Sequence, residues 1–299
     1  MKRIILTGYT GQLGHEITKR LECDYNNYFL ETSEKIILDK SRSKEFDITD
    51  KNFVLEYINA IKPDVIINCA AYTNVDQAEE NYEEAFRVNS LGPRNLAIAA
   101  EFVGAKLIHI STDYVFDGKG VIVNGEKMPY REYDVPGPIN VYGKTKLLGE
   151  NYVREFCSRY FIIRTSWLYG ENGSNFVKTI LRLAKEKGKL QVVNDQIGNP
   201  TNAEDLAGHI LKLAFTDEYG IYHCTGNGIA SWYDFACKIV EYAGIGCIVE
   251  PVTSEQYARK AKRPSYSCLD NMMLRSTIGD NMRYWEEALK DFIKNTLKL

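Results

Sequence analysis

The sequence predicts an α/β protein in which a doubly wound parallel sheet is joined to a smaller, mainly helical C-terminal region. Three observations predict this class. Short, continuously apolar, β-branched runs alternate with segments of helical periodicity, as expected for strands that are buried on both faces and joined by crossover helices. A glycine-rich turn follows the first apolar run and opens the first helical segment. Beyond Tyr169 the alternation becomes irregular, which indicates a change of architecture.

The pattern assigns a range to each expected element. Apolar runs predict strands at Arg3–Thr7, Lys35–Leu38, Asp64–Cys69, Lys106–Ser111, Tyr160–Thr165, Gln191–Val193 and Ile221–Cys224, and near Cys247–Glu250. Helical periodicity predicts helices at Gln12–Glu22, Lys51–Ile61, Tyr82–Val103, Lys144–Arg159, Phe176–Lys187, Ala203–Phe215, Ser231–Ala243 and Tyr284–Leu297.

The composition is that of an ordinary globular protein and argues against several functional classes. The 299 residues are 44% hydrophobic and 26% charged, which allows a large core. A net charge of −3 argues against a nucleic-acid-binding protein, and the short basic run 258–263 suits a phosphorylated small molecule better. No apolar run reaches the roughly 18–20 residues of a membrane span, and the apolar segment near the N-terminus is too short for a signal peptide.

The seven cysteines are scattered and never spaced as CxxC. This argues against a disulfide framework or a zinc site, and it favours the reducing cytoplasm as the location of the protein. The adjacent pair His15 and Glu16 has no ligand spacing that predicts a metal ion, so no metal is expected.

The glycine-rich turn has the character of a dinucleotide-binding site. Its glycines lie three residues apart between the first predicted strand and helix. In a Rossmann-type fold, such glycines permit a tight turn, close approach of the backbone to a pyrophosphate at the helix N-terminus, and close helix–strand packing. The cofactor contacts predicted here are Gly8, Thr10, Gly11, Gln12, Leu13 and Gly14.

Further cofactor contacts are predicted after the second strand. Asp39 ends that strand and can accept hydrogen bonds from the adenosine ribose, which favours NADH. Lys40 and Arg42 follow, and these cations could instead hold the 2′-phosphate of NADPH, unless the segment is a solvated loop of mixed charge. Either NADPH or NADH therefore stays open as the cofactor. Asp47 and Ile48 are expected to flank the adenine, although Asp47 could equally be a turn or cap residue.

Small residues end the third predicted strand. Ala70 and Ala71 leave room for a ligand at the carboxyl end of the sheet, so they and the following Tyr72 are predicted cofactor contacts. Simple close packing is the alternative. On these patterns, residues 1–169 form the dinucleotide-binding domain, and residues 190–224 return to its sheet. Residues 225–299, together with 170–189, form the substrate-binding region.

Tyr142 and Lys146 carry the chemistry that the sequence predicts. Residues four apart lie on one helix face, and a nearby ammonium favours the phenolate and lowers the pKa of a tyrosine. The phenol then becomes a proton donor near neutral pH. Thr112, at the end of the fourth strand, supplies a hydroxyl that can bind the same carbonyl oxygen and stabilise the developing alkoxide. An exposed helix with a tyrosine at its edge is the alternative for the Tyr142 segment alone.

These motifs together resemble the extended short-chain dehydrogenase/reductase family and, within it, the dTDP-4-dehydrorhamnose reductases. The resemblance covers nearly the whole chain and rests on 7–14, 68–73, 111–118, 141–146, 164–169, 194–201 and 262–267. It implies that Tyr142 is the general acid, that Lys146 holds the nicotinamide ribose, and that Thr112 is the hydroxyl partner. It also implies that the substrate contacts are Thr112, Asp113, Trp167, Gln196 and Arg263, the last two near the nucleotide diphosphate.

The resemblance further implies reduction of the C4 keto group of dTDP-4-dehydro-β-L-rhamnose, the last step of dTDP-L-rhamnose synthesis. The related 4,6-dehydratases have a glutamate where this chain has Tyr114, so dehydration is disfavoured. Two alternatives stay open: another nucleotide-sugar reductase or epimerase of the family, or a non-catalytic regulatory subunit that binds NAD(P). The expected partner is a nucleotide-sugar, and a homodimer is permitted but not specified.

Overall fold

A computed structural model describes residues 2–23, 36–39, 46–257 and 259–299. At its centre is a six-stranded sheet with the order β12-β7-β4-β3-β1-β2, and every neighbouring pair is parallel. The chain builds the sheet outward from β1 in both directions, so the strand order reverses between β1 and β3. The strands are β1 (Lys2–Thr7), β2 (Ile36–Asp39), β3 (Val65–Asn68), β4 (Lys106–Thr112), β7 (Tyr160–Thr165) and β12 (Gly220–His223).

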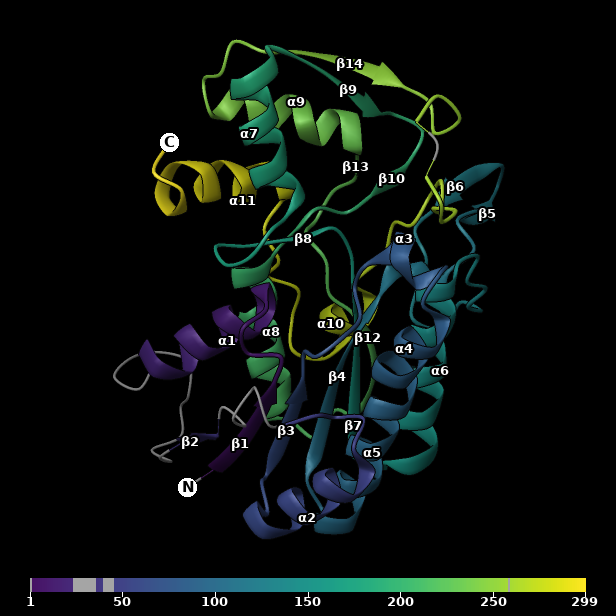
Figure 1. Cartoon of the computed structure of the whole chain (residues 1–299), viewed down its shortest axis with the longest axis vertical. Coiled ribbons are helices and arrows are strands. Elements are labelled where there is room, and N and C mark those ends of the chain that lie inside the picture. The colour runs from purple at the N-terminus through teal and green to yellow at the C-terminus, as the bar shows by residue number, and fades with distance from the viewer. Residues whose placement is uncertain (1, 24–35, 40–45, 258) are drawn as a thin grey trace.

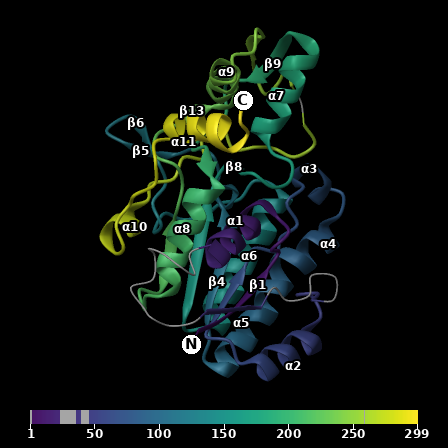
Figure 2. The same ribbon diagram turned by 90° about the vertical axis from the view of Figure 1, so that its left-hand side faces the viewer.

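Helices cover both faces of this sheet (Figures 1 and 2). Alternate residues of β1 point into two separate cores: Ile4 and Leu6 pack under α1 and α8, whereas Ile5 packs under the helices of the other face. This two-sided burial explains why the strands are continuous apolar runs. The first face carries α1 (Gln12–Cys23) and α8 (Ala203–Ala214), and the second carries α2 (Lys51–Ile61), α5 (Gly92–Val103) and α6 (Val141–Phe156).

Two predicted helices differ in their limits. The helix expected over 82–103 consists of α4 (Tyr82–Phe86), a π-helical turn (Arg87–Leu91) and α5, and α3 (Val75–Ala78) precedes it. Helix α6 begins at Val141 rather than at Lys144, because the Asn140 side chain accepts the Gly143 N–H at 2.8 Å and caps the helix there. Tyr142 therefore lies in the first turn of α6.

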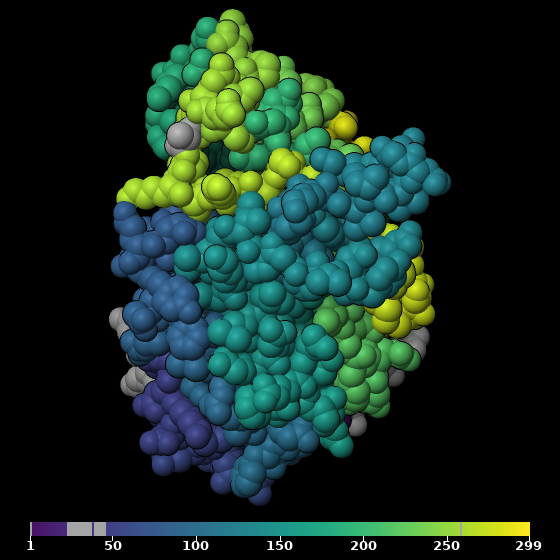
Figure 3. Space-filling view, turned by 90° about the vertical axis from the view of Figure 1, so that its right-hand side faces the viewer, coloured from purple at the N-terminus to yellow at the C-terminus, as the bar shows by residue number. Residues whose placement is uncertain are grey.

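A smaller lobe stands on the carboxyl-end side of the sheet (Figure 1), and the space-filling view shows a constriction between the two lobes (Figure 3). The smaller lobe has its own core, centred on Phe235, Trp285 and Phe292. Its elements are α7 (Phe176–Lys187), β9 (Lys189–Val193), α9 (Trp232–Tyr242), β14 (Ile248–Val252), α11 (Trp285–Asp291) and a final π-helical turn (Phe292–Thr296).

One strand prediction is wrong. The strand expected at 191–193 does not return to the central sheet, because β9 pairs in parallel with β14 in the smaller lobe. Its burial alternates, with Leu190 and Val192 inside and Lys189 and Gln191 outside. That one-sided pattern suits a small sheet with a single covered face. The strand expected at 221–224 does join the central sheet, as β12 beside β7.

Short elements connect the lobes. Strand β8 (Leu168–Tyr169) pairs with β11 (Thr201–Asn202), and β10 (Ile197–Gly198) pairs with β13 (Ala230–Ser231). The hairpin of β5 (Val121–Val123) and β6 (Glu126–Met128) projects from the larger lobe (Figures 1 and 3). A 3₁₀ turn (Asp113–Val115) follows β4, and α10 (Met272–Ser276) packs beside β12.

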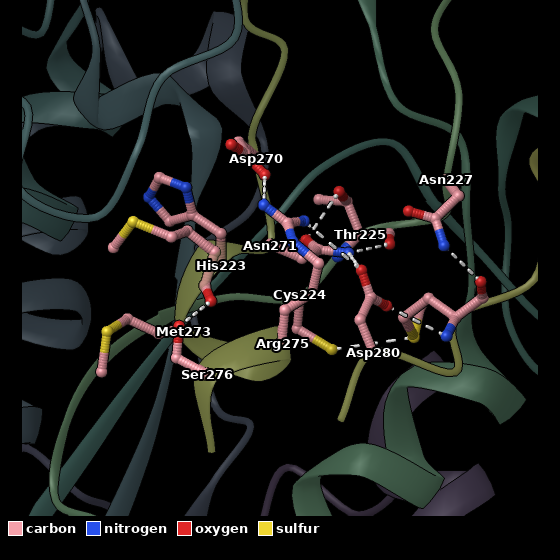
Figure 4. Close-up of polar contacts among 12 residues, drawn as sticks. His223, Cys224, Thr225, Asn227, Asp270, Asn271, Met273, Arg275, Ser276 and Asp280 are labelled. Carbon is pink, nitrogen blue, oxygen red and sulfur yellow. Dashed lines mark hydrogen bonds and ion pairs between the residues drawn. The ribbon is translucent and has the colours of Figure 1, made fainter. Parts of the chain in front are cut away.

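The C-terminal segment is fastened to the end of β12 by side-chain amides (Figure 4). Asn271 accepts the Thr225 N–H at 3.0 Å and donates to the Thr225 carbonyl at 2.9 Å. Asn227 donates to the Met282 carbonyl at 2.5 Å. Residues around α10 therefore belong to the larger lobe, although the chain then continues into α11 of the smaller one. Within the described ranges, every helix is too short or too polar to cross a lipid bilayer.

Candidate active site

A cavity of about 740 Å³ lies at the carboxyl ends of the central strands, where the strand order reverses. This is the position at which open α/β sheets bind ligands, and the volume is that of a cofactor pocket. Most of the predicted site residues line it: Gly8, Thr10, Gly11, Gln12, Leu13, Gly14, Asp47, Ile48, Ala70, Ala71, Thr112, Asp113, Tyr142, Lys146 and Trp167.

The three glycines of the β1–α1 turn differ in how strictly they are required. Gly8 has a φ of +67°, and a Cβ there would lie 2.6 Å from the Ala70 nitrogen. A Cβ on Gly14 would lie 2.3 Å from the Gly8 carbonyl oxygen, whereas one on Gly11 would lie 3.3 Å from it. Gly8 therefore lets the turn lie against the chain that leaves β3, Gly14 lets α1 start close against the turn itself, and Gly11 leaves the backbone bare toward the cavity.

The other predicted cofactor residues differ in whether they line the cavity. Asp47 lines the cavity and also accepts the Thr49 N–H at 2.8 Å, so it is both a wall residue and a turn residue. Tyr72 is not among the described residues that line the cavity, and its N–H donates to Asn89 Oδ1 at 2.8 Å. Asp39 ends β2 beside Ile5; its side chain, with Lys40 and Arg42, lies outside the described residues.

Tyr142 faces the cavity beside the end of β4. Its ring meets that of Tyr114 edge to face, with centroids 5.8 Å apart. Burial raises the pKa of Tyr142 to about 12; contact with the Thr112 hydroxyl lowers it and the Asp113 charge raises it. Thr112 donates to Asp113 Oδ1 at 2.9 Å, and burial raises the pKa of Asp113 to about 7. Phenol, hydroxyl and carboxyl thus share one wall.

The expected effect of Lys146 on Tyr142 is not found. The Lys146 ammonium donates to the Ile110 carbonyl at 2.6 Å and lies 3.4 Å from His109 Nε2. It is not among the groups that shift the pKa of Tyr142. Burial lowers the pKa of Lys146 itself to about 8, and the charge of Glu150 opposes this shift. The four-residue spacing places both residues toward the cavity, but burial rather than Lys146 determines the pKa of Tyr142.

A second cavity of about 330 Å³ lies between the lobes. Tyr114, Gln196 and Arg263 line it together with Trp232 of the smaller lobe. Trp232 stacks on Trp167, with ring centroids 3.5 Å apart and planes 6° apart. Because Trp167 lines the first cavity, the stacked pair lies between the two.

Trp167 and Arg263 are both held by their surroundings. Trp167 has a φ of +45°, which is unusual for a residue with a side chain and indicates a conformation imposed by packing. Arg263 forms a two-pronged ion pair with Asp76 of α3, at 2.7 and 2.9 Å. This pair lowers the pKa of Asp76 to about 2. Gln196 donates to Ser254 Oγ at 2.9 Å.

Several wall residues of the larger cavity are not among the predicted site residues. Ser111 donates to buried Glu150 at 2.5 Å, and Thr165 lies in register with Thr112 on the next strand. Hydroxyl residues at the carboxyl ends of both β4 and β7 were the available signal. The additional lining residues are Thr7, Phe46, Cys69, Thr73, Val88, Ile110, Ser111, Thr165, Ser166, Leu168, Gly173 and Ser174.

One group of potential metal ligands forms only in three dimensions. His15 and Glu16 of α1 meet Glu171, and one ligand atom from each lies within 4.8 Å of the others. Glu171 is already paired with Lys19 at 3.1 Å. Burial raises the pKa of Glu16.

Comparison with known proteins identifies the family. A family model described as "RmlD substrate binding domain" matches residues 1–298. The dTDP-4-dehydrorhamnose reductase of Aggregatibacter actinomycetemcomitans is 43% identical, over 97% of this chain and 98% of that protein. The chain belongs to the dTDP-4-dehydrorhamnose reductase family. The predicted extended short-chain dehydrogenase/reductase fold, a doubly wound parallel sheet with a smaller lobe, is thereby confirmed.

Solved structures of this family have the same architecture. A dTDP-4-dehydrorhamnose reductase from Clostridium acetobutylicum is 46% identical, with a TM-score of 0.90 over 99% of this chain and 100% of that one. The Bacillus anthracis reductase, solved in complex with NADP, is 43% identical, with a TM-score of 0.88 over 98% of each chain.

Proposed function

We propose that the chain reduces the C4 keto group of dTDP-4-dehydro-β-L-rhamnose with NADPH or NADH and releases dTDP-β-L-rhamnose, the last step of dTDP-L-rhamnose synthesis. The observation that carries this proposal is the position of Tyr142 and Thr112 on a wall of the cavity that also holds the glycine turn. Family membership and the similarity to a dTDP-4-dehydrorhamnose reductase support the choice of substrate.

The residues of the larger cavity fit a dinucleotide. The turn between Gly8 and Gly14 presents bare backbone at the N-terminus of α1, where a pyrophosphate is favoured. Asp47 and Ile48 flank the expected adenine position, and Lys146 lies deep enough to hold the nicotinamide ribose. A bound nicotinamide supplies the hydride. The NADP complex of the Bacillus anthracis relative supports this assignment.

Tyr142 supplies the proton. Reduction of a ketone leaves negative charge on its oxygen, which the phenol neutralises by giving up its proton, and the Thr112 hydroxyl is the second donor to the same oxygen. A high pKa for the phenol suits this role, because the group stays protonated until negative charge develops beside it. Asp113 is placed to accept a hydrogen bond from a sugar hydroxyl.

We assign the second cavity to the nucleotide diphosphate. Arg263 supplies a fixed cation there and Gln196 an amide, while the Trp167 face lies on the side of the larger cavity, where the sugar must meet Tyr142. On this proposal the smaller lobe is the substrate-binding part of the molecule and the larger lobe is the cofactor-binding part.

A coupled turnover assay tests the function. The purified chain is mixed with the dTDP-4-keto-6-deoxy sugar, a 3,5-epimerase and NADPH or NADH, and loss of nicotinamide absorbance is followed with product identification by mass spectrometry. Omission of the epimerase and the Tyr142→Phe variant are the controls. Epimerase-dependent oxidation that yields dTDP-rhamnose supports the proposal. Tightly retained cofactor with isomerised sugar would indicate an epimerase, and cofactor binding without turnover would indicate a regulatory subunit.

Two further properties belong to this proposal. The six cysteines whose side chains the structure describes are all free thiols, which supports a reducing cytoplasmic location. A homodimer stays open as the assembly, and sedimentation equilibrium of the purified chain would test it.

A further inference from the structure

Two buried polar residues of β4 meet two of α6 directly beneath the proposed proton donor. His109 and Ser111 are two apart on the strand and point to the same face, about 6.6 Å apart along it. Lys146 and Glu150 are four apart on the helix, about 6 Å along its axis. The matching spacing produces two contacts: His109 Nε2 lies 3.4 Å from the Lys146 nitrogen, and Ser111 donates to Glu150 at 2.5 Å.

On its other side, His109 is held by an amide whose orientation is fixed. Asn68 Oδ1 accepts both the Thr7 hydroxyl at 2.7 Å and the Ala70 N–H at 3.2 Å. Its Nδ2 therefore faces His109 Nδ1, at 3.0 Å. An amide NH₂ can only donate, so Nδ1 of His109 must be the acceptor.

This arrangement determines where His109 carries its proton. The ring is completely buried, and burial together with Lys146 lowers its pKa well below the ordinary value, so it is neutral. A neutral imidazole with Nδ1 as acceptor carries its hydrogen on Nε2. That N–H points at the Lys146 nitrogen. A protonated lysine has only hydrogen-bond donors, so it cannot accept this N–H. The neutral amine has a lone pair and would accept it.

The other groups around Lys146 do not cancel this effect. Glu150, on the same helix, favours the ammonium, but its carboxylate is bound by Arg164 of β7 at 2.7 Å. Cys69, after β3, is the other titratable neighbour, and burial raises the pKa of its thiol to about 12, so it is uncharged at neutral pH. The Ile110 carbonyl accepts one ammonium hydrogen.

We propose that Asn68 and His109 are positioning residues for Lys146: the Asn68 amide fixes the Nε2–H tautomer of His109, and that N–H makes the lysine a ready proton donor. A lysine that gives up its proton near neutral pH can restore the proton that Tyr142 loses in each turnover. This consequence rests on the proposed reductase function, whereas the tautomer itself does not.

The tautomer can be measured without any activity. In protein labelled with ¹⁵N-histidine, long-range ¹H–¹⁵N spectra distinguish the two neutral forms. His209 and His223 are internal references, because their Nδ1 atoms lie 3.0 and 3.1 Å from backbone carbonyls and must carry the hydrogen. We expect His109, assigned by its loss in His109→Gln, to show the opposite pattern. An Nδ1–H pattern at His109 would overturn the proposal, independently of which reaction the protein catalyses.

Asn68→Asp is the functional test. The carboxylate still accepts from Thr7 and Ala70, but it must also accept from His109, so the hydrogen moves to Nδ1 and Nε2 becomes an acceptor for the ammonium. For the wild type, the pH profile of kcat/KM should fall near pH 8 as Lys146 loses its proton. In Asn68→Asp this basic limb should move upward by about one pH unit.

A double-mutant cycle separates the tautomer from the added charge. In a His109→Leu background, the group that transmits the change is absent. Asn68→Asp should then shift the basic limb of the kcat/KM profile by less than about half of the shift that it causes in the wild-type background. Equal shifts in both backgrounds would mean that the charge acts directly and would sink the proposal. Circular dichroism checks that each variant is folded; if His109→Leu is not, His109→Gln replaces it, and the spectra of the wild type decide the tautomer independently.

Discussion

The two cavities are built in different ways. The larger one is formed by short contiguous motifs at the ends of neighbouring strands, and its turn is determined by backbone contacts such as Gly8 against Ala70. The smaller one is formed by segments far apart in the chain, and side chains hold it, including the stacked Trp167 and Trp232 and the ion pair of Arg263 with its partner. Substitutions in the first should therefore change cofactor affinity, and substitutions in the second should change substrate affinity.

The largest effect is expected at the proposed proton donor in the larger cavity. Tyr142→Phe removes the proposed proton donor and should lower kcat by about 10²–10⁴-fold, the usual contribution of general acid catalysis. The ring is retained, so the affinity for NADPH should stay within twofold or so. Single-turnover kinetics and calorimetric titration of the cofactor measure the two quantities. An undiminished kcat would remove Tyr142 from the mechanism.

The next largest effect concerns the backbone-defined cavity. Gly8→Ala and Gly14→Ala each place a Cβ under 3.0 Å from main-chain atoms, so the turn must move. We expect cofactor affinity to fall by about tenfold or more, or roughly 1.4 kcal/mol. Gly11→Ala should cost less, because its Cβ would lie 3.3 Å from the Gly8 oxygen. Calorimetry on folded variants compares the three. Equal losses in all three variants would show that these close main-chain contacts do not determine the turn.

The sequence predicted the larger cavity better than the smaller one. The strands of the central sheet were predictable because burial on both faces makes them continuously apolar, and the glycine turn was predictable because its chemistry is local. The environment of Tyr142 was not, because burial by distant segments, rather than the neighbouring Lys146, dominates its pKa. The placement of 191–193 failed because this strand is covered on one face only and pairs with β14, so its contacts lie in the smaller lobe and not in the central sheet.

The side-chain contacts of the second cavity were beyond the sequence altogether. No spacing indicates that Trp167 stacks on Trp232, or that Arg263 is paired with Asp76 from α3. The resemblance named Trp167, Gln196 and Arg263 as substrate residues, but only the structure separates them into two cavities. Tertiary contacts between segments with no local pattern account for this gap.

A smaller effect should follow from disturbing the stacked tryptophans. A Cβ at Gly198 would lie 2.6 Å from the Trp167 indole, so Gly198→Ala should displace that ring. We expect the KM for the nucleotide-sugar to rise by about tenfold, roughly 1.4 kcal/mol, with the affinity for NADPH unchanged. Gly246→Ala in the smaller lobe is the matched control, because nothing lies within 4 Å of the added atom. A loss of cofactor affinity in Gly198→Ala would contradict the separation of the two cavities.

The smallest expected effect is the choice between nicotinamide cofactors. Asp39 ends β2 and should repel a 2′-phosphate, whereas Lys40 and Arg42 should attract it. We therefore expect the two cofactors to be used within about tenfold of each other, roughly 1.4 kcal/mol. Raising the ionic strength should weaken NADPH binding more than NADH binding, because the additional phosphate makes NADPH the more highly charged ligand.

Asp39→Ala should move the preference toward NADPH, and Lys40→Ala with Arg42→Ala should move it toward NADH, as measured by kcat/KM for each cofactor at low and high salt. The direction matters more than the size, since the two substitutions remove charges of opposite sign from the same end of β2. If a strong preference persists through both, the cofactor is discriminated by a different part of the larger cavity. The rule that local motifs determine this cavity would then hold for the pyrophosphate turn but not for the ribose.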